Sequence, residues 1–108
     1  MPVIIGEVTT FANPKPDKAQ VLKIGEECME VFSAWEGWQY CLNADSSDCK
    51  EWACDRSCIF RKRIADECAD VIQAVSNLLD ALGVDDMREA MQECKERNVE
   101  RGRFETRE

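Results

Sequence analysis

Apolar residues recur every three or four positions in two long stretches of the chain, which is the period of an amphipathic helix. The first stretch predicts a helix from about Asp17 to Trp38, and the second predicts a helix from about Ile59 to Leu82. A shorter pattern predicts a third helix that begins at residue 85 or 86 and ends near Asn98. Gly83 follows the second stretch, where a C-cap glycine is common. The pattern therefore predicts an all-α protein with one domain over residues 1–108.

The first 16 residues lack this helical period and are expected to form an extended lead-in. Residues 1–16 contain all three prolines of the chain, and proline discourages a helix. Within this segment, Val3-Ile4-Ile5 has the composition of a brief strand or of an arm. Asn13 and Asp17 are both candidates for the N-cap of the first helix, because a short polar side chain accepts a hydrogen bond from the first turn.

Residues 39–58 also break the pattern and are expected to form a cysteine-rich loop insertion, with a helical turn or two between residues 49 and 58. Four cysteines fall in this segment, and they could bind zinc through thiolates, form disulfides in an oxidising setting, or stay free. Free thiols are the favoured interpretation, because the spacing contains no Cys-x2-Cys pair. The four are Cys41, Cys49, Cys54 and Cys58. The end of the chain, residues 99–108, is expected to be a charged tail.

The charge and composition of the chain exclude several kinds of partner. A net charge of −8 argues against binding nucleic acid polymers through their phosphates. No stretch approaches the roughly 18 apolar residues that a membrane helix needs, so no membrane partner is expected. The start of the chain lacks a basic segment followed by an apolar one, so a cytoplasmic location is expected. The absence of histidine excludes imidazole catalysis and zinc sites of mixed cysteine and histidine ligation.

Two pairs of carboxylates mark the long helices. Glu27 and Glu30 lie three residues apart in the first helix, and Glu67 and Asp70 have the same spacing in the second. This spacing puts both acids of a pair on one side of a helix. Either pair alone is common on a solvated helix face. Both pairs border an apolar stripe, however, where packing would partly bury them at a cost unless a cation is present. Carboxylates alone suit Mg²⁺ or Mn²⁺.

These residues match the signature of a known family. Glu26-Glu27-x-x-Glu30, followed by Glu67-x-x-Asp70, resembles the EExxE…ExxD signature of the MazG-type all-alpha nucleotide pyrophosphohydrolases. The resemblance covers about residues 21–38 and 63–103. It includes a similar helix start at residues 23–27, a similar turn at residues 83–85, and a C-terminal element formed by Lys95, Asn98 and Arg101. The chain departs from the family in its longer gap between the motifs, and in having the lead-in where the family has a first helix.

The resemblance implies a MazG-like helical bundle that is completed by oligomerisation, as a homodimer or a homotetramer. It also implies Mg²⁺-dependent hydrolysis of a nucleoside or deoxynucleoside triphosphate to the monophosphate and pyrophosphate, which serves to clean the nucleotide pool. Glu27, Glu30, Glu67 and Asp70 would bind Mg²⁺, or alternatively Mn²⁺. Glu26 and Glu27 would be catalytic, with Glu26 supporting a ligand or acting as the base for the attacking water. Lys95, Asn98 and Arg101 would contact the substrate. Lys95 and Asn98 are three residues apart where the family more often has four, so Lys62, Arg63 and Arg97 are alternatives to Lys95 for the phosphate contact.

Aromatic residues beside the cysteine-rich segment could contact a nucleobase. Trp38 and Trp52 are the candidates for this contact, whereas core packing is the commoner role for Trp35. Asn77 lies on the Asp70 side of its helix, where it could contact substrate, but an exposed polar residue is the favoured interpretation. An alternative function is a non-catalytic helical adaptor, with solvated acids and a cysteine-rich loop that binds zinc or a partner.

Overall fold

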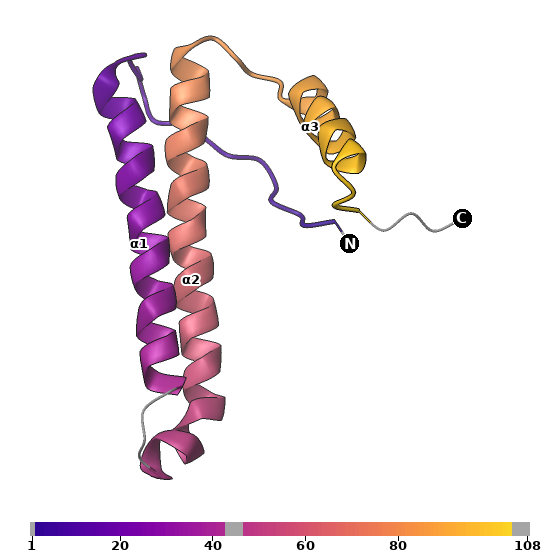
Figure 1. Cartoon of the computed structure of the whole chain (residues 1–108). Helices are drawn as coiled ribbons and strands as arrows, with labels where there is room; N and C mark the ends of the chain where they lie inside the picture. The colour runs from indigo at the N-terminus through magenta and orange to yellow at the C-terminus, as the bar shows by residue number, and fades with distance from the viewer. Residues whose placement is uncertain (1, 43–46, 105–108) are drawn as a thin grey trace.

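The computed structural model describes the backbone of residues 2–42 and 47–104, and the side chains of residues 2–42 and 59–104. The described residues form three helices and no strand, which confirms the all-α fold. These are α1 (Lys18–Leu42), α2 (Ser47–Ala81) and α3 (Arg88–Glu100). The first two helices lie side by side as an antiparallel hairpin, and α3 stands apart from them, without contact in the described part of the chain (Figure 1).

The ends of the long helices follow from their capping residues. Asp17 caps α1, because its Oδ1 accepts a hydrogen bond from the backbone N–H of Gln20 at 3.1 Å. Gly83 adopts a left-handed φ of 76° just after α2. The backbone N–H of Val84 then reaches back to the carbonyl oxygen of Leu79 at 2.8 Å, as in a Schellman motif. Both predicted caps are therefore confirmed.

The segment that was expected to be a loop is largely helical. Helix α1 continues to Leu42 and α2 already begins at Ser47, so residues 39–42 and 47–58 belong to helices. The prediction of a loop, which rested on composition, is wrong for residues 39–42 and 47–48, whereas the helical turns expected between residues 49 and 58 are part of α2. Residues 43–46 lie outside the described residues. Once a helix has been nucleated, adding residues to its ends is easy, and neither proline nor glycine occurs between residues 38 and 58 to stop it.

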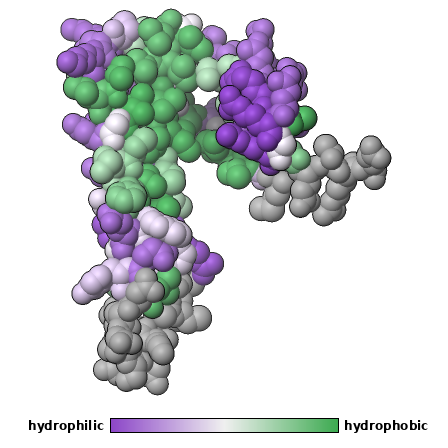
Figure 2. Space-filling view, in the orientation of Figure 1, coloured by the Kyte–Doolittle hydropathy of each residue, from purple (hydrophilic) through white to green (hydrophobic). Residues whose placement is uncertain are grey.

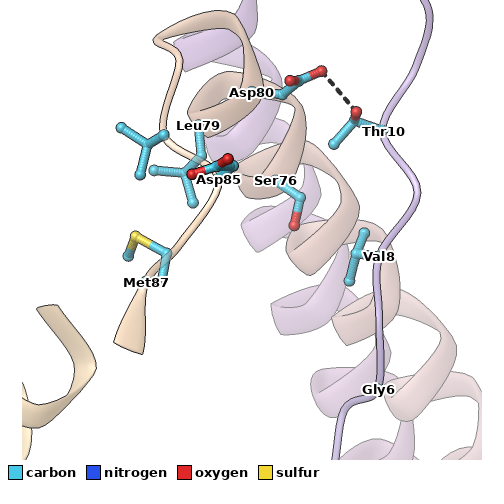
Figure 3. Close-up of a pocket in the computed structure, with 9 residues that line it drawn as sticks. Gly6, Val8, Thr10, Ser76, Leu79, Asp80, Asp85 and Met87 are labelled. Atoms are coloured by element: carbon cyan, nitrogen blue, oxygen red, sulfur yellow. Dashed lines mark hydrogen bonds between the residues drawn. The ribbon is translucent and has the colours of Figure 1, made fainter. Parts of the chain in front are cut away.

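The lead-in is an extended arm that three side chains of α2 hold in place. The side-chain amide of Gln73 donates to the carbonyl oxygen of Thr9 at 2.9 Å. The backbone N–H of Phe11 donates to Asn77 at 3.0 Å. Thr10 donates to the carboxylate of Asp80 at 2.7 Å, beside a pocket of about 430 Å³ (Figure 3). Residues 73, 77 and 80 form one stripe on α2, so the arm follows that stripe.

The most buried apolar side chains of α1 and α2 are small. Ala34 is fully buried and Ala74 is 5% exposed. Gly37 faces the ring of Phe60, because a Cβ placed on Gly37 would lie 3.7 Å from that ring. Small residues allow two helix backbones to approach closely, whereas the larger apolar residues lie around the contact rather than in it. The hairpin is therefore held by a narrow contact.

Much of the apolar surface stays uncovered within one chain. Phe32 and Trp35 of α1 are 51% and 47% exposed, and Leu82 is 58% exposed. Hydrophobic residues gather over the upper part of the hairpin, whereas α3 is mostly hydrophilic (Figure 2). The radius of gyration is 18.0 Å, compared with about 13 Å for a compact domain of this length. One chain therefore does not close a hydrophobic core of the usual kind.

Replacing Ala34 with leucine should test the narrow helix contact. The extra atoms have no space at a fully buried position, so we expect the Ala34→Leu variant to lose about 1–3 kcal/mol of unfolding free energy. Urea denaturation followed by circular dichroism measures this loss. Ala19→Leu, at an exposed position of α1, is the matched control and should change stability little. Equal stability of the two variants would show that α1 and α2 do not pack through Ala34.

Candidate metal centre

Four carboxylates from the two long helices converge at one place. Glu27 and Glu30 come from α1, and Glu67 and Asp70 come from α2. One carboxylate oxygen of each residue can be chosen so that all four lie within 4.8 Å of one another. The antiparallel hairpin brings each helix's pair opposite the other pair. The convergence that the sequence predicts is therefore present in the structure, while the binding of an ion there stays a prediction.

Two of these carboxylates each have one oxygen atom that is shielded from solvent and has no partner among the described residues. Glu27 is only 7% exposed. Its Oε2 atom and the Oε2 atom of Glu67 are both buried, and neither has a hydrogen-bond partner among the described residues. A buried carboxylate oxygen without a partner is costly in free energy. Glu30 and Asp70 are exposed. The helices therefore shield the cluster near Glu27 and Glu67, and solvent reaches it near Glu30 and Asp70.

The charge on Lys23 balances only part of the cluster. Its Nζ atom lies 3.0 Å from Oε1 of Glu27, and this hydrogen bond holds the pKa of Glu27 below its usual value. The Glu30 side chain has the opposite shift. Its hydrogen bond with Glu27 and the negative charge of that residue raise the pKa of Glu30, with a smaller contribution from Glu67. Glu30 thus holds its proton more tightly than an isolated carboxylate does, because it lies beside other carboxylates.

The oxygen spacing is close to what a divalent cation needs. Mg²⁺ binds oxygens at about 2.1 Å, so two ligands on opposite sides of the ion are about 4.2 Å apart. The 4.8 Å spread is slightly wider, and small rotations of the exposed Glu30 and Asp70 side chains would close it. An ion held by these carboxylates would supply positive charge beside Glu27 and Glu67, each of which has a buried oxygen without a partner among the described residues. The residues present therefore fit a Mg²⁺ or Mn²⁺ ion.

Glu26 lies next to the cluster but outside it. Its carboxylate is 66% exposed and forms a 3.5 Å ion pair with Lys23. Lys23 therefore contacts both Glu26 and Glu27, and this holds the two acids on neighbouring parts of the α1 surface. A role of Glu26 as base or supporting residue stays a prediction.

The structure does not bring the other predicted substrate residues to the cluster within one chain. Lys95 and Asn98 lie on α3, and Arg101 follows it, and α3 makes no contact with either long helix in the described part of the chain. Trp38 lies about 12 Å beyond Glu30 along α1, at a rise of 1.5 Å per residue. Trp52 lies outside the described side chains.

The cysteine cluster cannot be followed in the structure. Cys41 has a free thiol. The side chains of Cys49, Cys54 and Cys58 lie outside the described residues, so the zinc interpretation stays a prediction.

Phe11 and Gln73 lie beside the cluster and were not predicted to do so, whereas Asn77 was a candidate for contact with the substrate. A cavity of about 90 Å³ is lined by Phe11, Gln73 and Asn77 together with Glu27 and Asp70. Asn77 was expected to be exposed, but it is only 4% exposed because the arm covers it. The spacing of Gln73 and Asn77 from Asp70 was a usable signal, since residues three and seven positions apart share a helix face. Nothing in the local sequence points to Phe11.

The fold and the site together define an all-α protein with a carboxylate cluster between two antiparallel helices. Comparison with models of known families, with curated proteins and with solved structures gave no match to this chain. The described helices include none with the length and apolar character needed to cross a membrane. The resemblance to the pyrophosphohydrolases therefore rests on the motifs and on the geometry that they form.

The raised pKa of Glu30 predicts how pH affects the protein without metal. A folded-state pKa above the unfolded value of 4.5 means that stability falls as pH rises through the folded pKa. The Glu30→Gln variant should lack this loss and have the higher melting temperature near pH 7 in the presence of chelator. Thermal unfolding between pH 4.5 and 7 measures the difference. The lowered pKa of Glu27 acts in the opposite direction and below pH 4.5, outside this window.

Glu36→Gln, at an exposed site of α1 away from the cluster, is the matched control for charge alone. Addition of Mg²⁺ should reverse the order, because wild type then gains stability by binding the ion and Glu30→Gln gains little. Parallel pH curves for wild type and Glu30→Gln would contradict the crowding of carboxylates at this site.

Proposed function

We propose that this chain is a Mg²⁺-dependent nucleoside triphosphate pyrophosphohydrolase that acts in nucleotide-pool housecleaning. The reaction is (d)NTP and water to (d)NMP and pyrophosphate, with cleavage of the bond between the α and β phosphates. One observation carries the proposal. The acids of the EExxE…ExxD motifs converge between two helices, and two of their oxygens are buried without a partner.

The residues of the chain can be assigned roles in this reaction. Glu27, Glu30, Glu67 and Asp70 would hold the cation. Bound Mg²⁺ would neutralise phosphate charge and polarise the phosphoryl group. Glu26, which Lys23 holds beside Glu27, would orient the attacking water and accept its proton. The acidic cluster and the net charge of −8 both repel a triphosphate, so activity should require a divalent cation.

We further propose that the working unit is a homodimer or a homotetramer. The exposed apolar residues of α1 and the extended shape of the single chain both support this proposal. Helix α3 does not reach the carboxylate cluster of its own chain. In an assembly, Lys95, Asn98 and Arg101 of one chain would be able to lie near the cluster of another chain. The base contacts of Trp38 and Trp52 remain part of the proposal derived from the sequence.

Pyrophosphate release is the direct test of the reaction. A panel of nucleoside and deoxynucleoside triphosphates should give pyrophosphate with Mg²⁺ and none with chelator. The Glu67→Gln and Asp70→Asn variants should lose activity by about a hundredfold or more, because each removes a charged ligand. Glu26→Gln should lower kcat but leave Mg²⁺ affinity unchanged, which separates a base from a ligand.

Glu36→Gln should retain full activity and serves as the control. If folded wild-type protein releases no pyrophosphate from any substrate, the hydrolase proposal is wrong. The adaptor alternative would then be tested through zinc that co-purifies with the protein and supports its fold.

A charge placed on the exposed apolar stripe of α1 should weaken assembly. Phe32 is 51% exposed in the single chain, and we expect the Phe32→Glu variant to shift the molar mass toward that of a monomer. Sedimentation or light scattering measures the mass. Ser33→Glu adds the same charge at an exposed position beside the stripe and should leave the mass unchanged. A wild-type protein that is monomeric at micromolar concentration would contradict the proposed assembly.

A further inference from the structure

An exposed aromatic ring lies at the edge of the carboxylate cluster. Phe11 is 66% exposed, although it is a large apolar side chain. It lines the cavity of about 90 Å³ that Lys23, Glu27 and Asp70 also line. The ring thus borders the place where the phosphates of a nucleotide would bind with the cation. An apolar surface beside a phosphate site is what a nucleobase needs.

The backbone that carries this ring is fixed rather than loose. The N–H of Phe11 donates to Oδ1 of Asn77 at 3.0 Å, and Asn77 is only 4% exposed. The side-chain amide of Gln73 donates both to that same oxygen at 3.0 Å and to the carbonyl oxygen of Thr9 at 2.9 Å. The hydroxyl group of Thr10 also donates a hydrogen bond to Asp80 (Figure 3). Four hydrogen bonds therefore hold residues 9–11 on their anchors, which lie about one to three turns from Asp70 along α2.

Three aromatic residues near the C-terminal end of α1 are less suited to the same contact than Phe11 of the arm. Trp35 and Trp38 pack edge to face on one another, with ring centroids 5.3 Å apart. The indole nitrogen of Trp38 is buried, and the residue lies about 12 Å from Glu30 along the helix. Tyr40 is 79% exposed but lies further still from the cluster.

We propose that Phe11 stacks on the nucleobase of the nucleotide, and that Gln73 and Asn77 are positioning residues that hold the arm for this contact. The inference rests on the proposed function, because it assumes a nucleotide at the cluster. A phenyl ring offers a flat face and no hydrogen bond. The contact therefore favours a nucleotide over a bare polyphosphate but discriminates weakly among bases, with a modest preference for purines, which stack over a larger area.

Equilibrium binding with two ligands tests the contact separately from catalysis. The first ligand is adenosine triphosphate with a methylene group between the α and β phosphates, which cannot be cleaved there. The second is inorganic triphosphate, which has no base. Both are titrated calorimetrically with Mg²⁺ present. Phe11→Ala should weaken binding of the nucleotide by about five- to a hundredfold, the range for loss of one stacking contact, and leave inorganic triphosphate unchanged.

Further variants separate stacking from a structural role of the arm. Phe11→Tyr keeps the ring and should bind the nucleotide as wild type does. Gln73→Ala keeps the ring but removes two bonds of the anchor, and it should weaken nucleotide binding alone, by a smaller factor. Tyr40→Ala removes a more exposed aromatic residue away from the cluster and should change the binding of neither ligand.

The outcomes distinguish the two proposals. If wild type binds both ligands and Phe11→Ala binds the nucleotide equally well, the role of Phe11 is wrong and the hydrolase proposal stands. An equal loss of both ligands in Phe11→Ala would also overturn stacking, because it would show that the arm acts on the phosphate or metal site. If wild type binds neither ligand with Mg²⁺, the proposed function fails, and the role of Phe11 fails with it.

Discussion

Crowding of four carboxylates between two helices is the constraint that governs this structure. Glu27 and Glu67 are placed at the contact of α1 and α2, where an apolar side chain would stabilise the hairpin. The chain instead has charged side chains at this part of the helix contact, and two of their carboxylate oxygens have no hydrogen-bond partner among the described residues. Lys23 offsets part of the charge from one side only. Crowded carboxylates destabilise such a helix pair when no cation is present. A cation bound by acids of both helices would remove this repulsion and hold the helices together.

The rest of the hairpin is compatible with this arrangement because its packing is narrow. Ala34 and Ala74 let the backbones approach, and a close approach is what allows short carboxylate side chains from opposite helices to meet within 4.8 Å. Larger residues at these two positions would separate the helices and so separate Glu27 from Asp70. Phe32 and Trp35 point away from Ala34 around α1 and stay about half exposed.

The sequence predicted the parts that local rules control. Periodicity located the three helices, Asp17 and Gly83 located two of their ends, and the three-residue spacing of the acids located the cluster. The continuation of both helices into residues 39–58 was missed, because loop-like composition competes weakly with helix propagation. Phe11 and the burial of Asn77 were also missed. Both depend on the hydrogen bond between Phe11 and Asn77, which are 66 positions apart, and no local sequence pattern indicates such a contact.

The arm shows how a chain can cover a helix without another helix. A packed helix would bury apolar side chains of α2 under a second apolar stripe. The arm is instead held by hydrogen bonds, which Gln73 donates to Thr9 and Asn77 accepts from Phe11. These bonds fix residues 9–11, while Ile4, nearer the N-terminus, stays 92% exposed. Hydrogen bonds set the position of a short segment precisely at little cost in area, whereas they add only about 1 kcal/mol each to stability. Such a segment is better suited to positioning one side chain beside the carboxylates than to completing a core.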